Sequence, residues 1–210
     1  RRVAHVRRGS RAHALCALDQ IGPANFDSLE IAWRFKTDNL GPNREFNFQS
    51  TPLMVDGVVY STAGSRRAVV ALDAGNGELL WMHRLDEGQR GQVAPRQLSG
   101  RGLAYWEDGA DKRIVYVTPG YQLVALDART GHRVASFGDG GVVDLKENID
   151  QDLDPLTPEI GLHATPIVAN GLMYVPEGSG RVTAFDAVSG DVVWIHDRQF
   201  PSDIAISEGY

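Results

Sequence analysis

The sequence contains almost no cysteine and no long apolar run. Cys16 is the only cysteine among 210 residues, so a disulfide within the chain is excluded and cysteine usage leaves the redox compartment open. No stretch approaches the roughly 18 consecutive apolar residues that a membrane-spanning helix needs. The net charge of -6 also argues against a nucleic-acid partner, because proteins that bind nucleic acid usually present a basic surface.

Turn-forming residues are abundant, and basic residues gather at the start of the chain. The sequence is 42% hydrophobic and 23% charged, with 23 glycines and 10 prolines, which is typical of a folded chain with many short strands. Residues 1–16 contain five arginines and no acidic residue. A nucleic-acid arm and a targeting peptide are the two functional interpretations. The stretch lacks the apolar segment of a secretory signal, so we favour an irregular terminus over residues 1–17.

A repeated signature, A-x-D-x-x-x-G-x-x-x-W, organises the rest of the chain. It occurs intact at residues 71–81 and 184–194. A third copy at residues 125–135 has Ala135 in place of the tryptophan, and we expect Phe137 to substitute for it. Short β-branched or aromatic runs precede each copy, and such runs predict strands.

The Asp-to-Gly part of the signature predicts a hairpin. The side chains of Asp73, Asp127 and Asp186 are expected to cap backbone N–H groups, and the glycine four residues later can adopt a positive φ. These aspartates are 54 and 59 residues apart, which fits a four-stranded propeller blade of about 40–50 residues plus a loop insertion. A β-sandwich is the alternative, but it does not explain the repeated spacing.

The expected fold is therefore all-β, a partial arc of a β-propeller with four-stranded antiparallel blades. Three blades occupy most of the chain, and residues 29–37 predict one further strand that carries Trp33. Because a propeller needs about four blades to close, we expect the chain to be a fragment, or a shortened product, of a longer protein.

The signature resembles the tryptophan-docking motif of dehydrogenases that use pyrroloquinoline quinone (PQQ). Other stretches also resemble this family, notably the R-G-x-x-Y-W segment at residues 101–106 and the loop at residues 137–145. The resemblance extends over residues 18–197 and implies that they belong to an eight-bladed propeller. It also implies a PQQ cofactor, a Ca²⁺ or other ion beside it, and a periplasmic address.

This resemblance makes three residues candidates for cofactor binding. Arg101 stands where an arginine contacts a PQQ carboxylate or quinone oxygen, a role that suits a guanidinium fork; the alternative is a surface arginine in a glycine-flanked turn. Gln49 stands where a polar residue approaches the cofactor carboxylates, to which its amide can donate; the alternative is a polar residue at a strand start. His163 stands where a hydroxyl residue faces PQQ, and it can donate or carry a proton, although a lone histidine is more often structural.

The resemblance is incomplete at positions that matter for chemistry. Pro95 and Arg96 stand where alcohol-oxidising members have an adjacent cysteine pair. Glu177 lies near the place of the family's metal-ligating glutamate but does not align with it, so the metal ligands stay unassigned. The catalytic base is expected beyond Tyr210.

The function expected from these features is that of a PQQ-dependent dehydrogenase fragment. Such an enzyme oxidises an alcohol or sugar and passes electrons to PQQ and then to an electron acceptor. We expect the fragment to be inactive in isolation. A non-enzymatic periplasmic propeller scaffold and a degenerate family copy are the alternatives. The absent cysteine pair favours the scaffold, whereas Arg101 and its sequence context favour the enzyme lineage.

Both ends of the chain depart from the family pattern. Family members begin with W-x-x-Y-G-G-D and then T-R-Y, and a back-translation of residues 2–17 read one base over gives W-P-T-Y-G-G-D and T-R-Y-A. We therefore hypothesise a reading-frame slip that is restored near Leu18. Residues 198–210 are expected to be a truncated tail.

Overall fold

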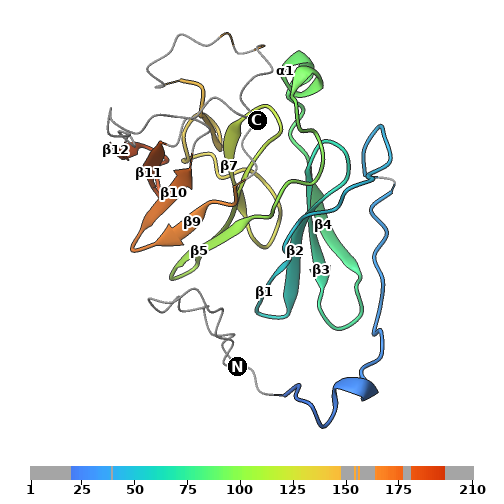
Figure 1. The fold of residues 1–210 in the computed structure, drawn as a ribbon. Helices are drawn as coiled ribbons and strands as arrows, with labels where there is room; N and C mark the ends of the chain where they lie inside the picture. Colours follow the sequence, from blue (N-terminus) through green and yellow to red (C-terminus); the bar gives the residue numbers. More distant parts are fainter. Residues whose placement is uncertain are drawn as a thin grey trace, which may run out of the picture.

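The computed structural model contains three four-stranded sheets and very little helix (Figure 1). Within the described part of the chain, no helix is long and apolar enough to cross a membrane. The expected irregular start at residues 1–17 and the expected tail at residues 198–210 lie outside that part. The structure describes residues 20–38, 40–147, 154, 156, 164–176 and 181–196.

Each sheet is an antiparallel meander of four consecutive strands, as in the blade of a β-propeller. Blade 1 consists of β1 (Leu53–Val55), β2 (Val58–Ala63), β3 (Ala68–Asp73) and β4 (Leu79–His83). Blade 2 consists of β5 (Ala104–Asp108), β6 (Asp111–Val117), β7 (Gln122–Asp127) and β8 (Val142–Asp144). Blade 3 consists of β9 (Ile167–Ala169), β10 (Leu172–Pro176), β11 (Val182–Asp186) and β12 (Val192–His196). The short helices are η1 (Phe26–Ser28), before blade 1, and α1 (Gly88–Val93), between blades 1 and 2.

The signature aspartates cap their turns, which confirms the predicted hairpins. Asp73 Oδ1 accepts hydrogen bonds from the N–H groups of Gly75 and Asn76, at 2.8 and 3.0 Å. Asp127 and Asp186 accept from the residues two and three positions later in the same way. The glycine that ends each turn has a φ between 72° and 80°, a conformation that glycine adopts without strain.

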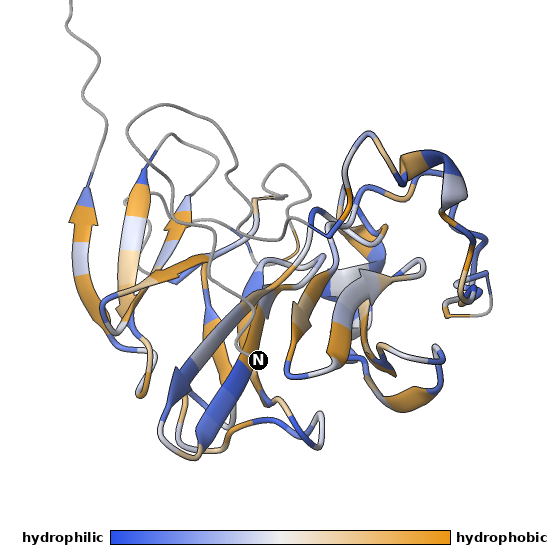
Figure 2. Ribbon diagram, turned by 90° about the horizontal axis from the view of Figure 1, so that it is seen from below, coloured by the Kyte–Doolittle hydropathy of each residue, from blue (hydrophilic) through white to orange (hydrophobic). Residues whose placement is uncertain are grey.

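Blade 2 is buried between the other two blades. Successive side chains of a strand point to opposite faces of its sheet. In β6, Ile114 and Tyr116 pack with apolar side chains of blade 1, whereas Val115 and Val117 pack with those of blade 3. Apolar residues run along the strands of all three blades, and hydrophilic residues gather mainly at the turns (Figure 2). Face-to-face packing of successive four-stranded sheets confirms a propeller arc.

In each blade, the glycine of the signature turn lies against an aromatic ring from the segment that precedes that blade. A β-carbon on Gly77 would lie 2.6 Å from ring atoms of Trp33, and one on Gly131 would lie 2.5 Å from the ring of Trp81. Real β-carbons do not approach other atoms so closely, so each ring requires a residue without a side chain.

The repeat copy that lacks tryptophan docks through Phe137, as expected. Its ring is fully buried and lies against Gly190 of blade 3, where a β-carbon would come within 3.1 Å of two ring atoms. Phe137 follows the signature position held by Ala135 by two residues. The extra length is taken up in blade 2, whose last strand β8 begins only at Val142.

The strand expected over residues 29–37 does not form. No strand is assigned to them, because no other described segment pairs with their backbone groups. Trp33, which this segment carries, is nevertheless docked on Gly77 of blade 1. The apolar pattern therefore located the docking residue correctly but could not supply a pairing partner.

Candidate functional site

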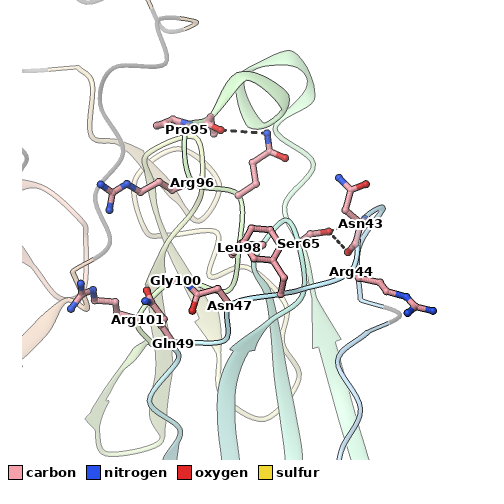
Figure 3. Close-up of a pocket in the computed structure, with 13 residues that line it drawn as sticks. Asn43, Arg44, Asn47, Gln49, Ser65, Pro95, Arg96, Leu98, Gly100 and Arg101 are labelled. Carbon is pink, nitrogen blue, oxygen red and sulfur yellow. Dashed lines mark hydrogen bonds between the residues drawn. The ribbon is translucent and has the colours of Figure 1, made fainter.

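A pocket of about 480 Å³ opens beside blades 1 and 2, at the end where the chain enters β1 and β5 (Figure 3). This volume lies in the usual range for small-molecule sites. Residues 43–49 form one wall and residues 94–101 form the other, with Ser65 of the β2–β3 turn between them. Ser65 joins this turn to the first wall, because its hydroxyl donates to the carbonyl of Asn43 at 2.7 Å and accepts from the N–H of Asn43 at 3.0 Å.

Two of the three predicted cofactor residues line this pocket together. Gln49 and Arg101 are 52 positions apart in the sequence but lie next to each other in Figure 3. The cause is a backbone contact, because the N–H of Thr51 donates to the carbonyl of Arg101 at 3.0 Å and Thr51 forms a parallel bridge with Gly102. Both side chains are exposed and thus free to contact a ligand.

The third predicted residue, His163, lies outside the described residues. The described chain resumes at Ala164, and Thr165 already approaches the pocket end of blade 2. A β-carbon on Gly102 would lie 3.3 Å from the hydroxyl oxygen of Thr165. Blade 3 is therefore entered close to Arg101, and the role of His163 stays a prediction.

The pocket is cationic. Arg44, Arg96 and Arg101 line it together with the amide side chains of residues 43, 47, 49 and 97, and no carboxylate is found among its described lining residues. Arg96 and Arg101 extend on the same side of their loop in Figure 3, and Arg44 extends on the other side. Guanidinium and amide N–H groups together suit a ligand that carries several carboxylates.

Glu45, which is adjacent to the pocket, serves its structure. One carboxylate oxygen accepts from the N–H of Gly64 at 2.9 Å, and the other accepts from the N–H of Ser99 at 3.1 Å. Glu45 thereby connects the β2–β3 turn and the 94–101 wall to the segment that carries Gln49. Both of its carboxylate oxygens thus accept hydrogen bonds from the protein itself.

Helix α1 leads into the 94–101 wall and is anchored on blade 2. Arg90 forms a bidentate ion pair with Asp144 and donates to the carbonyls of Gly120 and Tyr121. Burial alone would raise the pKa of Asp144, but the hydrogen bonds and charge of Arg90 hold that pKa below its usual value. Glu87, just before the helix, accepts from the Gly120 N–H at 3.0 Å. The wall therefore starts from a fixed point.

The described residues do not assemble a metal centre. No group of three or more His, Cys, Asp or Glu side chains converges anywhere in the described ranges. Glu177, which the sequence placed near a metal-ligating position, lies outside those ranges. The described residues therefore offer donors for an organic anion, but they offer no group of carboxylates for Ca²⁺.

Sequence reasoning missed part of the pocket. Arg44 and Arg96 were not predicted as ligand-binding residues, although Arg96 and Arg101 flank one short loop. Two arginines five positions apart around a glycine were the available signal. The opposite wall gave none, because residues 43–47 have no motif that ties them to residues 94–101.

Comparison of the sequence with protein families gives two matches, which overlap at residues 157–159. Residues 4–159 match a family described as "Glucose/ethanol/alcohol dehydrogenase, beta-propeller domain". Residues 157–208 match a family described as "Outer membrane protein assembly factor BamB". The first match covers more than half of the chain and includes both walls of the pocket.

Individual relatives point the same way. The chain is 32% identical over 192 residues to the dehydrogenase subunit of alcohol dehydrogenase (quinone) from Komagataeibacter europaeus, covering 84% of this chain and 22% of that protein. It is 25% identical over 206 residues to the glycerol dehydrogenase large subunit of Gluconobacter oxydans (strain 621H), covering 89% and 27%. The crystal structure of quinohemoprotein alcohol dehydrogenase from Comamonas testosteroni matches with a TM-score of 0.64 and 25% identity, over 85% of this chain and 24% of that chain. The chain thus spans about a quarter of the length of these relatives.

Proposed function

Because this chain belongs to the β-propeller family of glucose, ethanol and alcohol dehydrogenases, we propose that its pocket is part of the PQQ site of a quinoprotein dehydrogenase. The observation that carries the proposal is the meeting of Gln49 and Arg101 in one cationic pocket. The proposed substrate is an alcohol or a sugar, and the proposed setting is the periplasm.

The residues present fit the chemistry of this cofactor. PQQ carries three carboxylates and an ortho-quinone, and the described lining of the pocket offers guanidinium and amide donors without a competing carboxylate. Bound PQQ supplies the oxidant that accepts two electrons from the substrate. Arg101 orients a carboxylate or quinone oxygen through its planar fork. Gln49 donates to a carboxylate from its amide, and His163 is proposed as a further donor.

The three blades contribute only part of such an enzyme in this proposal. The chain spans about a quarter of its relatives, and no metal cluster is seen among the described residues. We therefore expect PQQ binding without turnover of alcohol or sugar. The catalytic base, the metal ligands and the contact to the electron acceptor would come from other parts of a complete enzyme.

A binding experiment tests the proposal. PQQ is titrated into the purified chain and into the Arg101→Gln variant by calorimetry, and the loss of the guanidinium is expected to weaken binding about tenfold or more. Arg129→Gln is the matched control, because Arg129 is 74% exposed at the turn of blade 2 and is not among the pocket residues. Equal affinity for the wild type and Arg101→Gln would exclude this site.

A second candidate function is a non-enzymatic propeller scaffold. It is favoured by the match of residues 157–208 to the family of an outer membrane protein assembly factor. The scaffold hypothesis does not explain the cationic pocket, and it predicts that PQQ does not bind the wild type. The titration therefore separates the two functions directly.

A further inference from the structure

Arg67 is a buried arginine behind the pocket wall. It directly precedes β3, and the residue is only 3% exposed. The guanidinium donates to the backbone carbonyls of Arg96 at 3.2 Å, Leu98 at 3.1 Å and Val117 at 2.7 Å. Among the described residues no carboxylate forms an ion pair with it. Burial lowers the pKa of Arg67 to about 10, so it stays charged at neutral pH.

The turn that delivers Arg67 is strained. Arg66 and Arg67 have φ values of 129° and 52°, both in a region that residues with a β-carbon rarely adopt. Such strain persists only where surrounding structure enforces it, and it concentrates at functional sites. Here the N–H of Arg66 donates to the carbonyl of Gln97 at 2.7 Å, so the strained turn is bound to the same loop that Arg67 holds.

The loop in turn is shaped to receive the guanidinium. Gly100 has a φ of 74°, and a β-carbon there would lie 2.7 Å from Nε of Arg67. The backbone of Gly100 therefore rests directly on the guanidinium, while Arg96 and Leu98 accept its hydrogen bonds. Three alternate residues of the wall, Arg96, Leu98 and Gly100, therefore contact the side chain of Arg67.

We propose that Arg67 is a positioning residue, which fixes residues 96–101 so that Arg96 and Arg101 present their side chains to an anionic ligand in the pocket. The inference rests on the proposed function for the identity of that ligand. Burying this charge is costly, and the hydrogen bonds to the wall carbonyls and to Val117 offset part of that cost. Arg67 also places a positive charge directly behind Gly100, and the carboxylate of Glu87 partly offsets it.

A purely structural role for a buried arginine is represented in the same chain by Arg113. It is 2% exposed and donates to the carbonyls of Ala187 and Val188 at the junction of blades 2 and 3. It does not line the pocket. Arg113→Lys is therefore the matched control for Arg67→Lys, since both variants keep the charge and lose the fork.

The first experiment measures hydrogen–deuterium exchange of the ligand-free full chain. In Arg67→Lys, a peptide covering residues 94–102 is expected to exchange about tenfold faster or more, because the wall loses its hydrogen bonds to the guanidinium. Strand β10 should stay protected. In Arg113→Lys the 94–102 peptide should exchange as in the wild type. Unchanged exchange of this peptide in Arg67→Lys overturns the proposal.

The second experiment titrates PQQ into the same proteins. Arg67→Lys is expected to weaken binding about fivefold or more, and Arg113→Lys by less than about twofold. Faster exchange of the wall with unchanged PQQ affinity overturns the positioning role. If the wild type itself fails to bind PQQ, the proposed function falls, and the exchange experiment still decides whether Arg67 fixes the loop.

Gly100→Ala decides the matter if Arg67→Lys does not fold. It retains Arg67 but forces a methyl group against the guanidinium. The wall should then exchange faster and PQQ should bind more weakly, as for Arg67→Lys. Wild-type exchange and affinity in Gly100→Ala would refute the proposed contact between the loop and Arg67.

Discussion

Arg113 donates a hydrogen bond from its guanidinium to the carbonyl oxygen of Ala187, 3.0 Å away, across the junction of blades 2 and 3. The equivalent carbonyl of blade 2, that of Ala128, accepts from the indole N–H of Trp81 at 3.1 Å. Phe137 replaces the tryptophan at the later junction and has no N–H to donate. Two residues thus replace the missing tryptophan: Phe137 provides the docking ring, and Arg113 provides the hydrogen-bond donor.

The replacement donor is itself held in place. Arg113 forms an ion pair with Asp111, and its guanidinium lies 4.9 Å from the ring centre of Trp106. Arg113→Met should therefore destabilise the fold by about 2–3 kcal/mol, because the buried carbonyl of Ala187 loses its partner. Urea unfolding at neutral pH measures the loss. The exposed Arg129→Met should change stability by less than about 0.5 kcal/mol, and a similarly small effect at Arg113 would contradict the assignment.

Trp81 and Trp194 occupy the same signature position but should differ in their contribution to stability. Trp81 docks on Gly131 and donates to Ala128, whereas Trp194 is 40% exposed. Trp81→Ala is expected to cost about 3 kcal/mol and Trp194→Ala about 1 kcal/mol or less. Chemical unfolding of the two variants side by side provides the comparison. Equal losses would mean that docking on glycine adds nothing to burial.

The Arg90–Asp144 pair predicts a specific pH dependence. The pKa of Asp144 is lowered in the folded chain, so its ionised form stabilises the fold above the ordinary aspartate pKa of about 3.9, and that stability is lost as the pH falls through the folded value. Wild type should exceed Asp144→Asn in stability at neutral pH, and the difference should shrink below about pH 4. Unfolding curves at several pH values test this expectation.

Asp56 offers a matched control for that experiment. It also pairs with a cation, Lys112, but both side chains are substantially exposed, at 61% and 32%. Exposed pairs contribute little and are screened by salt. Asp56→Asn should therefore have a smaller effect than Asp144→Asn at neutral pH. The reverse order would show that the anchor of α1 is not an important contact.

The blades were predictable because their signals are local. An aspartate followed four residues later by a glycine specifies a turn through contacts within a few residues, and this held at Asp73, Asp127 and Asp186. Phe137 was also predictable, since its distance from the vacant tryptophan position is only two residues. The strand expected over residues 29–37 failed because a strand needs a partner, which a local pattern does not contain.

The site was only partly predictable, because its contacts are long-range. The resemblance predicts Gln49 and Arg101 as cofactor ligands, and that role stays a prediction; their meeting in one pocket depends on a backbone contact between Thr51 and Arg101. Arg67 gave no signal, because its inward direction follows from positive φ values in a turn whose sequence, apart from Gly64, does not favour them. A residue of this kind can be recognised only once the conformation of its turn is known.

The proposed function requires that the pocket recognise the carboxylates of PQQ through Arg101. Calorimetric titration with PQQ and with its uncharged trimethyl ester tests it most directly, in the wild type and in Arg101→Gln. The wild type is expected to bind PQQ at least about tenfold more tightly than the ester, and Arg101→Gln is expected to lose most of this preference. Equal binding of acid and ester by the wild type, or a preference that persists in Arg101→Gln, would contradict it.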